Sequence, residues 1–171
     1  MRKTYRYKAE MNQETEVNCQ IWLDLCCDLY NASLENRRKA YASNGVVLSH
    51  YDQSTELPFI KEEMPEYKMV CSDTLQQVLD RVQKAYNLFF SNLKARNGRA
   101  GLPRFKRRPR YDSFTLKNWC WKMERNRLYI RNIGTLKLHL SRPIEGDIKQ
   151  ITVKRDRCGD WFVTFSCDNV P

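Results

Sequence analysis

The hydrophobic pattern of this chain changes its period at one place, a basic stretch over residues 91–111 that we call the basic strap. Before the strap, apolar residues recur every three or four positions, which is typical of helices; after it they alternate, which is typical of strands. Gly98, Gly101, Pro103 and Pro109 prevent a continuous helix through the strap itself. The pattern therefore predicts a helical segment and a β segment joined by the basic strap.

The charge of the basic strap is uncompensated. Its cations are Lys94, Arg96, Arg99, Arg104, Lys106, Arg107, Arg108 and Arg110, and no acidic residue lies among them. A phosphate backbone is the usual partner of such a run, because each neutralised phosphate releases condensed counterions. Phe105 and Tyr111 add rings on which bases can stack. The alternative is a solvated, flexible linker between two folded parts.

The whole chain is also basic, with a net charge of +10 over 171 residues. This balance favours nucleic acid or an anionic membrane surface over an acidic small substrate. No apolar run approaches the roughly 20 residues of a membrane-spanning helix. The N-terminal residues contain no apolar signal region, so we expect no membrane insertion and a cytoplasmic location.

The seven cysteines form no C-x-x-C pair, and only two histidines accompany them. A structural zinc site usually takes two closely spaced ligand pairs, so this pattern argues against zinc. It argues equally against a disulfide framework. We expect free thiols in a reducing compartment, used mostly as small apolar residues.

Helical periodicity covers three segments before the basic strap. The first expected helix is residues 15–42, with the apolar stripe Val17, Ile21, Trp22, Leu25, Leu29 and Leu34. The second is residues 49–57, capped by Ser49 and ended by Pro58. The third is residues 72–96, with the apolar stripe Leu75, Leu79, Val82, Tyr86, Phe89, Phe90 and Leu93. Ser72 is expected to cap the last helix and Asn97-Gly98 to close it.

Alternating patterns predict short strands at residues 4–8, 113–116, 119–122, 128–130, 135–140, 148–153 and 161–167. Short strands separated by turns suggest a closed or nearly closed antiparallel barrel. The strand at 4–8 would be unpaired among helices, so it is expected to join this barrel. The fold class is then α+β, with the helices inserted between the first and second strands of the barrel.

The sequence contains no motif of a known catalytic type, neither a phosphate-binding loop, nor a nucleophile elbow, nor an H-E-x-x-H pair. Its acidic clusters, Glu62, Glu63 and Glu66, and Asp156 and Asp160, fall in expected turns. A two-metal nuclease needs carboxylates that converge on the ions. We therefore expect a binding protein with no cofactor in this chain.

Several motifs carry a resemblance to a known family. They are Leu29-Tyr30-Asn31, Leu75-Gln76-Gln77-Val78-Leu79, Ala85-Tyr86, Phe89-Phe90, Gly101-Leu102-Pro103-Arg104-Phe105-Lys106, Arg131-Asn132-Ile133-Gly134, Arg142-Pro143-Ile144-Glu145-Gly146 and Ile151-Thr152-Val153. Through them, nearly the whole chain resembles the N-terminal half of TnpB, the transposon-encoded RNA-guided nuclease related to type V CRISPR effectors. The resemblance implies an OB-like wedge barrel of residues 1–9 and 104–171, a helical recognition domain of residues 10–97, and a basic linker of residues 98–103.

The resemblance also implies partners and contact residues. The chain would bind a guide RNA and read a short motif in a target DNA duplex. The residues that would face RNA are Arg6, Lys94, Arg96, Arg99, Arg104, Lys106, Arg107, Arg108 and Arg110. The residues that would contact the DNA motif are Tyr51, Ser72, Gln76, Thr115, Lys117 and Asn118.

TnpB carries a RuvC-like nuclease domain, with its acidic metal ligands, after the barrel, and the sequence ends at Pro171 before such a domain. No catalysis is therefore expected from this chain alone. Two other functions remain open at this point. One is a guide-free DNA-binding repressor; the other is a subunit of a split effector, which docks a separate RuvC nuclease chain or a second copy.

Overall fold

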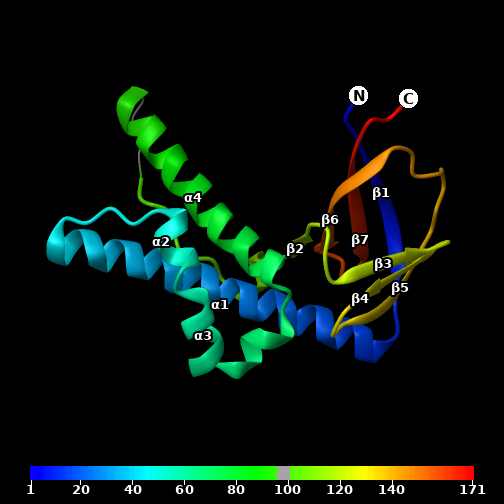
Figure 1. The fold of residues 1–171 in the computed structure, drawn as a ribbon, viewed down its shortest axis with the longest axis horizontal. Coiled ribbons are helices and arrows are strands. Elements are labelled where there is room, and N and C mark those ends of the chain that lie inside the picture. Colours follow the sequence, from blue (N-terminus) through cyan, green and yellow to red (C-terminus); the bar gives the residue numbers. More distant parts are fainter. Residues whose placement is uncertain (96–100) are drawn as a thin grey trace.

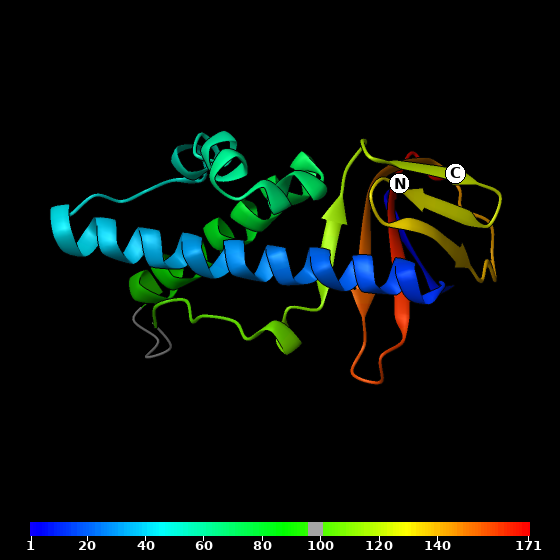
Figure 2. The ribbon, with the colours of Figure 1, turned by 90° about the horizontal axis from the view of Figure 1, so that it is seen from below.

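The computed structural model describes residues 1–95 and 101–171. Its helices are α1 (Gln13–Asn44), α2 (His50–Ser54), α3 (Leu57–Glu63) and α4 (Ser72–Ala95), with the short 3₁₀ segments η1 (Pro65–Met69) and η2 (Arg108–Arg110). Its strands are β1 (Lys3–Glu10), β2 (Ser113–Leu116), β3 (Trp121–Glu124), β4 (Arg127–Ile130), β5 (Gly134–Leu138), β6 (Asp147–Arg155) and β7 (Trp161–Asp168). Helices and sheet occupy opposite ends of the molecule, and α1 runs along both (Figures 1 and 2).

All the strands form one curled antiparallel sheet in the order β2-β6-β7-β1-β5-β4-β3. Strand β1 lies inside the sheet, paired with β7 from Lys3 opposite Cys167 to Ala9 opposite Trp161, and with β5 on its other side. The helices are thus inserted between the first and second strands, which confirms the expected α+β fold class. The edge strands β2 and β3 are not paired with each other, so the sheet is a half-barrel that remains open.

Alternation along β1 explains its central place. Tyr5, Tyr7 and Ala9 are buried, while Arg6 and Lys8 are exposed. The Tyr7 ring packs edge-on against Phe165, with 5.9 Å between ring centroids. One apolar face and one cationic face suit a strand that packs on a core on one side only.

Helix α1 connects the two ends of the molecule. It begins after Asn12, whose side chain accepts a hydrogen bond from the Thr15 N–H at 2.8 Å. It ends at Gly45, which has the left-handed φ of +65° that glycine tolerates without strain. The Trp22 ring packs against the ring of Phe114 on β2, with 5.2 Å between the two ring centroids. Val17 and Ile21 were expected in its buried stripe but are 51% and 37% exposed, because the stripe that meets the sheet passes through Cys19 as well as the expected Trp22.

The short helices correct one expected boundary. Ser49 and Asp52 form the expected capping box at the start of α2. Pro58, expected to end this helix, instead lies in the first turn of α3, where its missing N–H leaves no hydrogen bond unmade. Ser72 is the first residue of α4, and the Cys71 carbonyl before it accepts the N–H groups of Thr74 and Leu75. The expected closing residues Asn97 and Gly98 lie outside the described residues.

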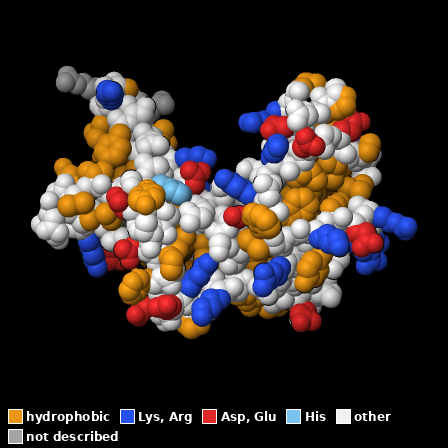
Figure 3. Space-filling view, viewed as in Figure 1, with side chains coloured by type: hydrophobic (Ala, Val, Ile, Leu, Met, Phe, Trp, Pro, Cys, Tyr) orange, Lys and Arg blue, Asp and Glu red, His pale blue; other side chains and the backbone are white. Residues whose placement is uncertain are grey.

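Helix α4 crosses α1 obliquely, from the side that carries α2 and α3 to the side that carries the basic strap (Figure 2). Its first half is buried through Leu75, Val78 and Val82. Near its end, Phe90 and Leu93 are 45% and 48% exposed, and apolar side chains show at the tip of the helical end (Figure 3). The apolar stripe of α4 therefore extends further than the core that covers it.

A disulfide bond joins Cys71, at the start of α4, to Cys120, in the β2–β3 turn. The expectation of free thiols is wrong for this pair. Their separation of 49 residues matches no short cysteine motif, and only the packing of the turn against the helix brings them together. Cys19, Cys26, Cys27 and Cys167 are free and buried, as expected of small apolar residues, and Cys158 is free and exposed.

No helix within residues 1–95 and 101–171 is long and apolar enough to cross a membrane.

Candidate nucleic-acid interface

The basic strap begins in the last turns of α4, and its second part, residues 101–111, is attached to α1. Asn31 makes two hydrogen bonds to the backbone of Lys106: its side chain accepts the N–H at 2.8 Å and donates to the carbonyl at 2.7 Å. Further along α1, Arg38 donates to the Pro103 carbonyl and places its guanidinium 4.8 Å from the centre of the Phe105 ring. This part of the strap is therefore packed on the helix, unlike a solvated linker.

Two cations of the strap point toward protein groups. The Lys106 amine lies 4.9 Å from the ring centroid of Tyr30 and 5.7 Å from that of Tyr111, and its desolvation lowers the pKa of Lys106. Arg108 forms an ion pair with Asp28 at 2.8 Å, and this hydrogen bond raises the pKa of the guanidinium. Both cations help to hold the strap on α1.

Tyr111 does not offer a stacking surface, contrary to expectation. It is 2% exposed, and its ring packs against Tyr30 at 5.9 Å between centroids. Burial raises the pKa of its hydroxyl. Tyr111 therefore anchors the end of the strap in the hydrophobic core. Phe105 is 50% exposed, so one aromatic ring of the expected pair remains at the surface.

Three cations of the strap point away from the protein. Arg104, Arg107 and Arg110 are exposed, and their side chains make no hydrogen bond or ion pair with any residue that the structure describes. A groove of about 730 Å³ separates residues 101–111 of the strap from α4, and its walls include Arg104, Arg110, Phe105 and Leu88. The groove has cationic and aromatic groups, which are the groups that bind a single nucleic-acid strand.

The other expected RNA contacts lie on separate elements. Lys94 is exposed in the last turn of α4. Arg6 is exposed on β1, with its guanidinium 4.1 Å from the centre of the Phe162 ring. Arg96 and Arg99 lie outside the described residues. In the face shown in Figure 3, cationic side chains lie on both walls of the hollow between the helical end and the sheet, with a few acidic ones among them.

Most of the expected DNA-motif residues lie around the start of α4. Ser72 and Gln76 are one helical turn apart on α4, and the disulfide bond joins this turn to the loop that carries the exposed Lys117 and Asn118. Tyr51 on α2 is 75% exposed, and its neighbour His50 places Nε2 at 3.2 Å from the Gln76 carbonyl oxygen. The fold thus brings three separate segments to one surface.

Thr115 does not belong to this exposed surface. It is 7% exposed, and its hydroxyl lies 3.1 Å from that of Thr152 and 3.4 Å from a guanidinium nitrogen of Arg81. Its polar atom is therefore used inside the protein, where α4 meets β2 and β6.

Sequence patterns missed two residues of this region. Arg81 donates to the Ser113 carbonyl at 2.9 Å and lies 5.4 Å from the Tyr111 ring centroid, so it joins α4 to β2 and to the strap. Trp119, beside Asn118 in the β2–β3 turn, is 72% exposed. Nothing in the spacing of either residue distinguishes it from ordinary surface or core; only the packing does.

Among residues 1–95 and 101–171, no group of three or more histidine, cysteine or carboxylate side chains is arranged to hold a metal ion.

Comparison with known proteins adds the family context. No model of a known protein family matches the chain. A protein of Streptomyces pristinaespiralis, whose name proposes an RNA-guided DNA endonuclease, is 31% identical over 99% of this chain and 42% of that protein. InsQ of Escherichia coli (strain K12), whose name proposes the same activity, is 23% identical over the same shares of both chains.

A solved structure shares the fold. The chain in a cryo-EM structure of a Cas12f1-sgRNA-target DNA complex matches with a TM-score of 0.56 at 13% identity, over 100% of this chain and 49% of that one. The chain spans about two fifths of the length of the curated relatives it matches. As its motifs predicted, the chain resembles part of the RNA-guided DNA endonucleases of the TnpB type.

Proposed function

We propose that this chain is the RNA- and DNA-binding part of a TnpB-type effector, which binds a guide RNA and reads a short motif in a target DNA duplex. In such a system base pairing with the guide supplies the sequence recognition, and the protein supplies phosphate contacts and motif reading. The activity proposed in the names of the two relatives supports this type of function, and so does the fold shared with the chain of the Cas12f1 complex. Residues 1–9 and 104–171 would act as the wedge, residues 10–97 as the recognition domain and residues 98–103 as the linker.

The observation that carries this proposal is the outward row of Arg104, Arg107 and Arg110 beside the groove between the strap and α4. These guanidiniums have no carboxylate partner among the described residues, while the strap beneath them is fixed to α1. A fixed row of unpaired cations suits the backbone of a folded RNA, because the protein loses little conformational entropy when it binds. The RNA would contact this side of α1.

The DNA duplex would contact the other side, around the start of α4. Gln76 is half-exposed there, and a glutamine amide is capable of a bidentate hydrogen bond to adenine in the major groove. Lys117 and Asn118 lie in the loop that the disulfide bond joins to the start of α4. Because α4 crosses α1, its beginning lies on the DNA side and its end on the RNA side (Figure 2).

Neutralising the outward row tests the proposal. In the variant Arg104→Gln, Arg107→Gln, Arg110→Gln, affinity for the RNA that copurifies with the protein should fall. The slope of log affinity against log salt should decrease in magnitude by about two, because each phosphate contact to a single strand contributes about 0.7. Binding of this RNA is measured by fluorescence anisotropy at salt concentrations from about 50 to about 200 mM, over which the affinity is expected to fall steeply.

The matched control is Lys39→Gln, Lys84→Gln, Lys154→Gln, which removes the same charge from lysines that already face Glu35, Asp80 and Asp112. Lys106 and Arg108 are left intact because they hold the strap. An unchanged RNA affinity in the first variant, or an equal loss in both, would contradict the proposal.

A further inference from the structure

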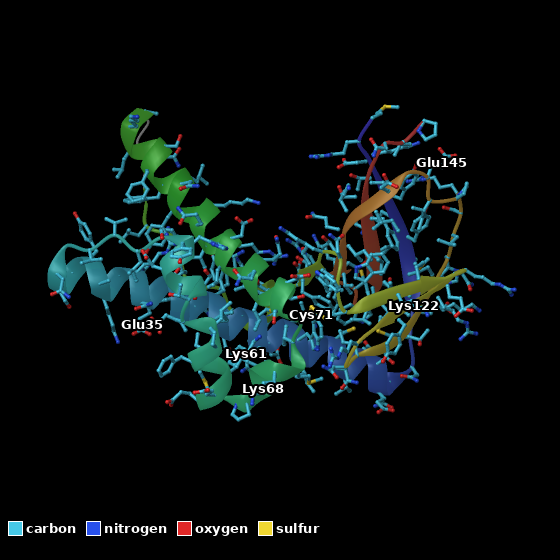
Figure 4. All side chains as sticks on the ribbon, in the orientation of Figure 1. Glu35, Lys61, Lys68, Cys71, Lys122 and Glu145 are labelled. Carbon is cyan, nitrogen blue, oxygen red and sulfur yellow. A yellow bond between two sulfur atoms is a disulfide. The ribbon has the colours of Figure 1, made fainter. Side chains whose placement is uncertain are left out.

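A second cationic site lies at the junction between the helices and the sheet, away from the basic strap. It is a cavity of about 190 Å³, and its lining includes Lys61, Lys68, Ser72, Arg131 and Asn132, together with the Cys71–Cys120 disulfide. Figure 4 labels Lys61, Lys68 and Cys71, which follow one another on α3, η1 and the start of α4. Arg131 and Asn132 come from the β4–β5 turn of the sheet.

The cations of this cavity are not neutralised. No carboxylate lines it, and neither Lys68 nor Arg131 makes a side-chain hydrogen bond or ion pair within the described parts of the chain. The Lys61 amine donates to the Ser72 hydroxyl at 2.7 Å, which leaves its charge uncompensated. Three cations from three separate elements therefore surround one small space, and like charges held this close favour an anion between them.

The walls of the cavity are fixed from both sides. The Asn132 amide donates to the Met69 carbonyl at 3.1 Å, and the Arg131 N–H donates to the Cys120 carbonyl at 2.8 Å. The disulfide bond joins the same two sides. The volume is several times the roughly 30 Å³ that a water molecule occupies in the liquid, so a tetrahedral anion has room.

We propose that this cavity binds one phosphodiester group of a DNA duplex backbone. The choice of DNA rests on the proposed function, because the expected motif residues Ser72, Lys117 and Asn118 lie beside the cavity on the two elements that the disulfide joins. A phosphate held by Lys68 and Arg131 would contact the helical end and the sheet together. It would fix the register in which the duplex meets Gln76, since backbone contacts position a duplex and base contacts read it.

The test is the double variant Lys68→Ala, Arg131→Ala, and its matched control is Lys39→Ala, Lys84→Ala, which removes two lysines already paired with carboxylates. Binding of a mixed-sequence DNA duplex to the full chain is measured as a function of salt. The double variant should bind the duplex more weakly, and its salt slope should decrease in magnitude by about one, as expected for one lost phosphate contact. The control should keep the slope of the original protein.

A hairpin RNA in the same assay separates the two proposals. Its affinity should be the same for the original protein and for the Lys68→Ala, Arg131→Ala variant. An unchanged DNA salt slope in that variant, or a parallel loss of RNA binding, would overturn the assignment of the cavity. If the original protein fails to bind RNA at all, the proposed function fails, whatever the DNA assay gives. Far-UV circular dichroism verifies that both variants are folded.

Discussion

At the scale of single residues, cations of the same charge differ in their exposure and in the groups that they contact. Arg37 is 5% exposed and forms no ion pair with the described residues; it donates to the side-chain oxygens of Gln53 at 2.8 Å and Gln83 at 2.9 Å. Burial lowers the pKa of Arg37. Arg104 carries the same charge at the surface with no partner in the described structure. Arg37 therefore joins α1, α2 and α4, whereas Arg104 is available to a ligand.

Gly134 is a residue whose replacement has a clear predicted cost. Its φ is +132°, and a Cβ atom there would lie 2.5 Å from the Thr15 Oγ1 atom. Gly134→Ala should therefore lower the free energy of unfolding by about 1–3 kcal/mol, the usual cost of a strained backbone conformation. Urea denaturation at neutral pH measures this loss.

Two comparisons isolate the cause. Gly101→Ala, where an added Cβ meets no atom within 4 Å, should leave the unfolding free energy nearly unchanged. Removing the obstructing hydroxyl in the double variant Thr15→Ala, Gly134→Ala should make the effect of the alanine at 134 smaller than in the original background. If Gly134→Ala unfolds at the same urea concentration as the original protein, the predicted clash is wrong.

At the scale of elements, α4 is held to β2 and the β2–β3 turn by contacts between residues that are far apart in the sequence. The disulfide bond joins the start of α4 to the turn, and Arg81 adds hydrogen bonds from the middle of α4 to β2. Both elements carry residues proposed to contact DNA. The geometry of that surface therefore depends on this connection more than on either element alone.

Breaking the disulfide bond should lower stability. The bond closes a loop with a sequence separation of 49 residues, for which loss of chain entropy in the unfolded state predicts about 4 kcal/mol of stabilisation. The variant Cys71→Ser, Cys120→Ser should thus unfold at lower urea concentration than the oxidised protein, and adding a reductant should shift the original protein in the same direction.

The exposed free thiol provides the control. Cys158→Ser removes a cysteine that is not bonded to another, and should leave the unfolding midpoint unchanged under oxidising conditions. Identical midpoints for the original protein with and without reductant would show that the bond contributes nothing to stability.

At the scale of the whole molecule, the helices and the sheet share one core. The buried cluster runs without a break from Trp22 and Cys26 on α1 to Phe114 on β2 and Val163 on β7. Glu16 on α1 also accepts a hydrogen bond from the Trp161 indole at 3.2 Å. The proposed wedge and recognition domains are therefore not separated by a gap in packing, because α1 of the proposed recognition domain packs directly on the sheet.

A shared core predicts a single cooperative unfolding transition. Far-UV circular dichroism reports mainly the helices, while tryptophan fluorescence reports the four tryptophans, of which Trp121 and Trp161 lie in the sheet, Trp119 lies in the β2–β3 turn and Trp22 packs against β2. With the disulfide bond intact, both signals should change at the same urea concentration. Two separated transitions would instead mean that the helical lobe and the sheet unfold independently.

Much of the fold follows from the sequence, because helix and strand periods depend on residues that are close together in the chain. The expected helix at 15–42 and the strand at 113–116 match α1 and β2 to within about two residues, a normal uncertainty for element ends. Pro58 was misplaced because a proline suits both the end of one helix and the first turn of the next.

The sequence by itself determined the order of the elements, the insertion of helices into the sheet, the basic character of the strap and the family resemblance. Tertiary structure alone decided which cations are available, which cysteines are bonded and which segments share a surface. Lys106 and Arg104 are two positions apart, yet one lies over tyrosine rings and the other faces solvent. The reason is physical: periodicity is a local property, whereas the partner of a side chain is set by contacts between segments far apart in the chain.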